Sequence, residues 1–106
     1  MERVNIVEEI GLPAMFGQLA EEATELAQAA LKLQRIQMGV NPTPVTEEHA
    51  FENLQEEEAD VMLCLDLIHN YLLKSDTCIR GYHYARSKIY EEKLKRWKKR
   101  LMEMER

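Results

Sequence analysis

Two clusters of acidic residues have a spacing that could hold a metal ion. Each contains a carboxylate pair three residues apart, Glu22 with Glu25 and Glu57 with Asp60. Residues three apart share one face of a helix, so two such pairs on neighbouring helices would surround one point with four carboxylates. Negative charges gathered in this way require a cation between them, and oxygen ligands favour a hard ion such as magnesium.

The simpler explanation is a solvated, Glu-rich helix surface, because such surfaces are common. An exposed glutamate on a surface of that kind is expected to have Lys or Arg four residues further on. Here Glu21 has Glu25 at that position, and Glu56 has Asp60. Because this arrangement repels itself and occurs twice, it favours a cation site over a solvated surface.

The elements that must position these carboxylates are helices. Of the 106 residues, 45% are hydrophobic, only 7% are aromatic, and Pro and Gly are few. The hydrophobic residues are mostly Leu, Ala, Met and Ile, and this mixture favours helix over sheet. We therefore expect an all-α fold and a single domain spanning 1–106, with a short helix or ordered arm at 2–10, long helices at about 12–38, 46–73 and 79–105, and a turn-rich loop at 39–45.

Apolar residues recur along the first two long helices with helical spacing, as at Leu19 and Leu33 in one and at Phe51 and Ile68 in the other. At about 100° per residue, both carboxylate pairs lie at the edges of these apolar stripes, and Glu58 falls near the middle of the second stripe. The edges of two antiparallel helices can meet. Three such helices leave one apolar side open, so we expect a second copy to complete a four-helix bundle or a larger assembly.

Charge and composition exclude several classes of protein. The net charge is −5, yet the segment Arg86–Arg106 has nine basic and four acidic residues. An acidic body with a basic tail argues against binding duplex nucleic acid over a broad face. No apolar run reaches the roughly 20 residues of a membrane span, and the N-terminus lacks a signal-peptide pattern. Cys64 and Cys78 are too isolated for a zinc site and are expected to be reduced, so we expect a cytoplasmic protein without membrane contact.

The segments around both acidic pairs resemble the MazG-like, all-α nucleoside triphosphate pyrophosphohydrolases. The matching segments are 18–26 and 56–62, which contain that family's signature of Glu-x-x-Glu followed by Glu-x-x-Asp. The resemblance covers roughly residues 11–73. It implies a MazG-like four-helix bundle that is completed by oligomerisation, as a homodimer or a homotetramer.

The same resemblance implies a chemistry. Relatives cleave the α–β phosphoanhydride bond of nucleoside triphosphates and release a monophosphate and pyrophosphate. One of the metal-site glutamates would be the general base, and which one is left open. The residues that would bind Mg²⁺, with Mn²⁺ as an alternative ion, are Glu22, Glu25, Glu57 and Asp60.

Binding of the nucleoside triphosphate is also assigned by resemblance. Gln18, one turn before the first acidic pair, is a candidate for orienting a ligand. The basic C-terminal segment departs from the family pattern. Many relatives have an Asn close to the basic residues, whereas this chain has Glu91 and Glu92 there. The alternative for the tail is a solvated basic helix. The residues of the last helix that would contact phosphates are Lys88, Lys93 and Arg96.

Two functions of other classes stay open at this point. A non-catalytic helical interaction module would use the apolar stripes for assembly and the glutamates for solubility. A nucleotide-binding sensor would bind the same ligand without turning it over.

Overall fold

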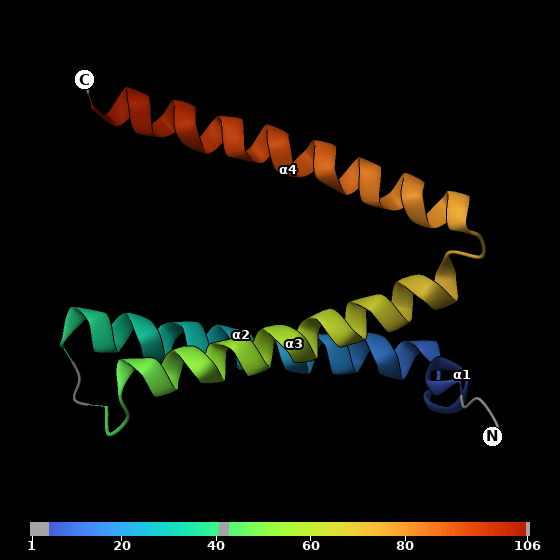
Figure 1. Ribbon diagram of the computed structural model, residues 1–106, viewed down its shortest axis with the longest axis horizontal. Helices are drawn as coiled ribbons and strands as arrows, with labels where there is room; N and C mark the ends of the chain where they lie inside the picture. The colour runs from blue at the N-terminus through green and yellow to red at the C-terminus, as the bar shows by residue number, and fades with distance from the viewer. Residues whose placement is uncertain (1–4, 41–42, 106) are drawn as a thin grey trace. The chain divides into compact units, whose positions relative to one another are not determined.

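The computed structural model describes residues 5–40 and 43–105, and all regular structure in these residues is α-helical (Figure 1). In chain order the helices are α1 (Ile6–Ile10), α2 (Leu12–Met38), α3 (Glu47–Leu72) and α4 (Asp76–Met104). The expected all-α class is therefore confirmed. Residues 2–4 of the predicted N-terminal arm and residues 41–42 of the predicted loop lie outside the described residues. No helix in the described ranges combines the length and hydrophobicity needed to cross a bilayer.

Local sequence signals set the ends of the long helices. Gly39 terminates α2 in a left-handed conformation with φ of 66°, and its N–H donates to the carbonyl oxygens of Arg35 and Ile36. The side-chain oxygen of Thr46 accepts a hydrogen bond of 3.1 Å from the N–H of His49 in the first turn of α3. Gly39 and Thr46 are thus residue types that commonly end and begin helices, and each makes the corresponding hydrogen bonds here.

Helix α4 begins three residues before the position that the sequence suggested. Ser75 caps it, because its hydroxyl oxygen accepts a hydrogen bond of 3.2 Å from the N–H of Cys78. A glycine inside a helix costs about 1 kcal/mol relative to alanine, and a side-chain cap contributes about as much. The cap at Ser75 therefore offsets Gly81, and the helix continues through it.

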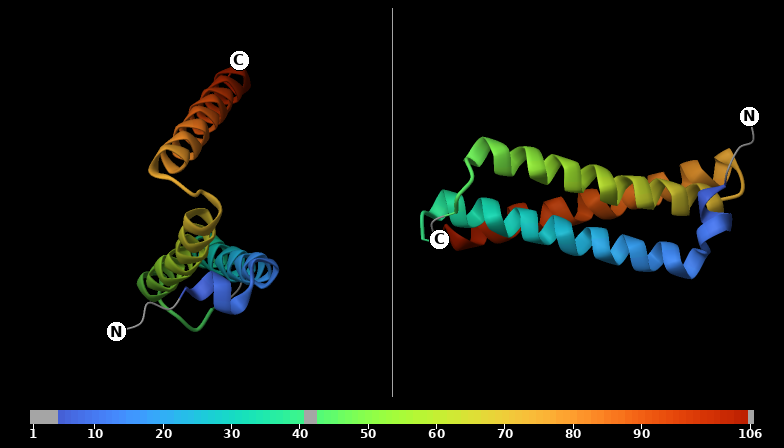
Figure 2. Two further views of the ribbon diagram at one scale, coloured as in Figure 1. Left: turned by 90° about the vertical axis from the view of Figure 1, so that its right-hand side faces the viewer. Right: turned by 90° about the horizontal axis from the view of Figure 1, so that it is seen from below.

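The chain divides into two structural units, Met1–Tyr71 and Leu72–Arg106. In the first unit α2 and α3 lie side by side and antiparallel (Figures 1 and 2). Met15, near the start of α2, shares a buried cluster with Ile68, near the end of α3. At the opposite end, the Gln37 amide donates a hydrogen bond of 3.0 Å to Glu47. The second unit consists mainly of α4, which has no buried residue.

The face of α3 that packs on α2 differs from the predicted apolar stripe. Phe51, expected on the stripe, is 63% exposed, whereas the neighbouring Ala50 is buried. Glu58, expected near the middle of the stripe, is exposed, and Glu57 is half-buried instead. Within the single chain, the face of α3 that α2 covers is therefore centred about one residue away from the predicted stripe, and Glu57 lies nearer to it than Glu58 does.

Candidate metal centre

Helices α2 and α3 form an antiparallel hairpin, and the line along which they pack is called the seam. Each of the two helices has one glutamate on this seam. Glu22 and Glu57 are half-buried, and each has a buried residue seven positions before it and another seven positions after it. A seven-residue repeat returns to the face that a neighbouring helix covers. The two glutamates thus occupy positions where an apolar side chain is expected. The flanking buried residues are Met15 and Ala29 on α2 and Ala50 and Cys64 on α3.

The antiparallel register brings both predicted carboxylate pairs together. One side-chain oxygen from each of four residues lies no more than 4.8 Å from the others. In octahedral magnesium coordination, opposite oxygens are about 4.2 Å apart, so small rotations of the terminal side-chain torsions would bring the oxygens onto one ion. The residues that converge are Glu22, Glu25, Glu57 and Asp60.

Two oxygens of this cluster lack any partner within the described part of the chain. They are Oε2 of Glu22 and Oε2 of Glu57, both buried and without a hydrogen bond. A buried polar atom left unsatisfied is unfavourable, and more so when it is charged. Within the same residues no Lys or Arg pairs with any member of the cluster. A cation is therefore the partner that these oxygens fit.

Gln18 holds one member of the cluster in place. Its side-chain amide donates a hydrogen bond of 2.7 Å to Oε1 of Glu22, one turn along α2. This bond fixes one oxygen of the carboxylate and leaves the buried Oε2 directed away from the amide. Gln18 therefore contacts a predicted metal ligand directly, which is the geometry of a residue that orients the ligand.

Repulsion and burial act on the protonation of Glu22. The hydrogen bond from Gln18 is the largest single influence and lowers the pKa of Glu22. Burial, the negative charges of Glu25 and Asp60, and the close approach of the Glu25 side chain together outweigh it, so that the pKa lies above its ordinary value of 4.5. The mutual repulsion that the sequence suggested is thus present in the folded chain.

A buried thiol adjoins the cluster but does not extend its set of metal donors. Burial, followed by the charges of Glu22 and Asp60, raises the pKa of Cys64 above its ordinary value of 9.0. The thiol accordingly stays protonated near neutral pH, and the thiolate is the form that binds metals. The donor set consists of carboxylate oxygens alone, which suits Mg²⁺ or Mn²⁺ better than a thiophilic ion.

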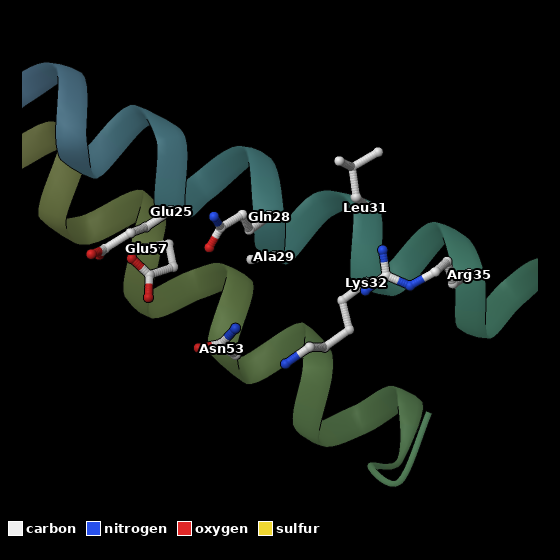
Figure 3. Close-up of a pocket in the computed structure, with 8 residues that line it drawn as sticks. All are labelled: Glu25, Gln28, Ala29, Leu31, Lys32, Arg35, Asn53 and Glu57. Carbon is white, nitrogen blue, oxygen red and sulfur yellow. The ribbon is translucent and has the colours of Figure 1, made fainter. Parts of the chain in front are cut away.

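A cavity of about 580 Å³ opens beside the carboxylates, between α2 and α3. Glu25 and Glu57 lie at one end of it, as Figure 3 shows, and Lys32 and Arg35 lie at the other. The sequence analysis did not include this basic pair. A signal existed, because Lys32 follows Glu25 by seven residues and therefore returns to the same side of α2.

The basic residues predicted to contact phosphates lie on α4, in the other structural unit. Lys88, Lys93 and Arg96 are all exposed. The ammonium nitrogen of Lys88 lies 5.5 Å from the centre of the Tyr84 ring, on the same helix. Their assignment to substrate binding stays a prediction.

Comparison with known proteins found no matching family model, no matching curated protein and no matching solved structure. The MazG-like resemblance stays a prediction made from the two acidic segments.

Proposed function

We propose that this chain is a magnesium-dependent nucleotide pyrophosphohydrolase of the MazG-like type. The observation that carries the proposal is the convergence of four carboxylates from two helices, two of them on the helix seam with a buried oxygen that has no partner. A surface cluster of acidic residues would leave every oxygen hydrated. Burying unpaired carboxylate oxygens is costly, and a bound cation removes that cost.

The proposed reaction assigns a task to each residue of the cluster. Glu22, Glu25, Glu57 and Asp60 would hold the ion, and Gln18 would keep Glu22 in the binding orientation. Magnesium bound there would supply positive charge that offsets the charge developing on the phosphate oxygens. One of the glutamates would accept a proton from the attacking water. The oxygen of that water would bond to the α-phosphorus as the bond between the α-phosphorus and the oxygen that bridges to the β-phosphorus breaks. The products are a nucleoside monophosphate and pyrophosphate.

Assembly into a homodimer or homotetramer belongs to the same proposal. Leu94, Trp97 and Leu101 are exposed on α4 at helical spacing. A row of apolar side chains with this spacing is typical of a helix face that packs on another helix. Sedimentation velocity should therefore give a mass at least twice that of the single 12.4 kDa chain.

The direct test is to incubate the purified protein with a panel of NTPs and dNTPs plus magnesium and to measure pyrophosphate. We expect release from at least one nucleotide, with loss of release in Glu25→Gln and Asp60→Asn. If no substrate gives pyrophosphate, or if both variants release it as fast as the native chain, the proposal is wrong.

Two other functions would give different results in the same samples. A nucleotide sensor would bind a nucleotide with magnesium and form no product. A helical interaction module would show no thermal stabilisation by magnesium and nucleotide, whereas a ligand that binds the folded state must raise the melting temperature.

A further inference from the structure

The cavity beside the carboxylates has opposite charge at its two ends. Glu25 and Glu57 form one end, and Lys32 and Arg35 form the other (Figure 3). Its volume of about 580 Å³ falls within the range of about 300–1,000 Å³ typical of small-molecule sites. A ligand that fits it must bring positive charge to one end and negative charge to the other.

The basic pair is not neutralised by the chain itself. Lys32 and Arg35 are three residues apart on α2, so that their positive charges lie on one face of the helix. Both are half-buried, and neither side chain has a hydrogen bond or an ion pair within the described residues. Like charges held at this spacing repel each other. An anion between or beside them would relieve that repulsion.

The spacing along α2 suits a short polyphosphate. Lys32 follows Glu25 by seven residues, which is a rise of about 10 Å. Side chains of a helix lean toward its N-terminus, and because the lysine side chain is longer than that of Glu25 it covers part of that interval. In Figure 3 the lysine also reaches across toward α3. A separation below about 10 Å is one that a short polyphosphate can span.

The lining between the two ends combines two amide side chains with the aliphatic Ala29 and Leu31, and it contains no aromatic ring among the described lining residues. Gln28 from α2 and Asn53 from α3 place amide groups there (Figure 3). Amides donate hydrogen bonds to phosphate oxygens, whereas a nucleobase would call for a stacking partner. This lining favours the phosphate portion of a nucleotide over its base.

We propose that this cavity binds the pyrophosphate portion of the substrate, with Lys32 and Arg35 contacting the two phosphates that leave. The proposal rests on the function proposed above and deepens it. It also moves the phosphate contacts from α4, where the sequence analysis put them, to the hairpin that holds the carboxylates. In the reaction the basic pair would stabilise the negative charge that pyrophosphate acquires as the α–β bond breaks.

The test measures binding of inorganic pyrophosphate with magnesium by isothermal titration calorimetry, at fixed ionic strength. We expect Lys32→Gln combined with Arg35→Gln to weaken binding by about tenfold or more, since hydrogen bonds to charged groups are among the stronger ones. Lys32→Arg should retain most of the affinity because it keeps the charge. Circular dichroism and retained magnesium binding would show that the variant is folded.

Two further variants make the result specific to the cavity. Lys95→Gln with Lys98→Gln removes the same charge from exposed positions of α4 and should leave the affinity within about twofold, as expected for screened surface charges. Lys93→Gln with Arg96→Gln tests the sites predicted on α4. If that pair lowers the affinity while the α2 pair does not, or if the native chain binds no pyrophosphate, the inference is wrong.

Measuring turnover in the same variants separates this inference from the proposed function. If nucleotides are hydrolysed but the α2 variant has the native KM and the native inhibition by pyrophosphate, the function stands and the cavity assignment fails. If nucleotides are not hydrolysed but pyrophosphate binding depends on Lys32 and Arg35, the anion site stands and the hydrolase proposal fails.

Discussion

The α2–α3 hairpin and α4 are built from helices of similar length but place their charged residues differently. The helices contain 27, 26 and 29 residues, in chain order from α2 to α4. In the hairpin, Glu22 and Glu57 are half-buried on the seam between two helices, whereas every described charged residue of α4 is exposed. In both units, helical spacing places residues of like charge on one face of a helix. A second helix in fixed register is what turns such a row into a site with defined geometry.

The strongest test of this difference removes charge from the seam and from the surface separately. Glu57→Gln should reduce pyrophosphate release by about a hundredfold to a thousandfold, because the loss of one ligand weakens both metal binding and charge stabilisation. Glu58→Gln removes an exposed charge from the next residue and should change the rate by less than about twofold, within the usual range for surface substitutions. Equal losses in the two variants, measured at saturating magnesium, would remove the distinction between seam and surface.

The contribution of apolar side chains to the free energy of unfolding should also differ between the two units. Ile68→Ala removes a side chain that is 3% exposed, and we expect it to lower the free energy of unfolding by about 3 kcal/mol. Leu101→Ala on α4 removes one that is 60% exposed and should change it by less than about 0.5 kcal/mol in the dissociated chain. Urea denaturation at low protein concentration measures both. A large loss for Leu101→Ala that grows with protein concentration would instead reveal the assembly that we propose.

The effect of orienting one metal ligand on magnesium affinity can be measured separately from the effect of removing a ligand. Gln18→Ala leaves all four carboxylates in place but removes the hydrogen bond to Glu22, and we expect magnesium affinity to fall by about tenfold. Gln34→Ala, an exposed residue of the same helix, is the matched control and should bind like the native chain. Calorimetric titration with magnesium distinguishes the two, and unchanged binding in Gln18→Ala would mean that the hydrogen bond does not orient the site.

The smallest expected effect is a dependence of stability on pH. Because the folded-state pKa of Glu22 is raised above 4.5, its charge destabilises the fold above that raised pKa, and the penalty fades as the pH falls toward 4.5. In EDTA, Glu22→Gln should therefore be more stable than the native chain near pH 7, and the difference should shrink on acidification. Melting temperatures of the native chain and of Glu22→Gln, measured from neutral pH down toward 4.5, show which of the two is more stable. A difference in melting temperature that widens at low pH would contradict this prediction.

The amino-acid pattern was sufficient for the helices, since periodicity and caps act locally. The two pairs of acids three residues apart also identified the four carboxylates that the antiparallel register brings together. It was insufficient for the exact face of α3, because Phe51 fits an apolar stripe as well as Ala50 does until the partner helix is placed. Lys32 and Arg35 were missed for the same reason. On one helix they look like ordinary surface charges, and they become part of a candidate site only when α3 closes the other side of the cavity.

The antiparallel register of α2 and α3 also determines where this chain can change in length. Residues inserted between Gly39 and Glu47 extend only the connection, so the pairing of Met15 with Ile68 and the convergence of the carboxylates would persist. A single residue inserted in α2 between Glu22 and Ala29 would rotate the rest of that helix by about 100°. It would carry Ala29 and Leu33 off the seam, so natural variation in length is expected in the connection and not in the helices.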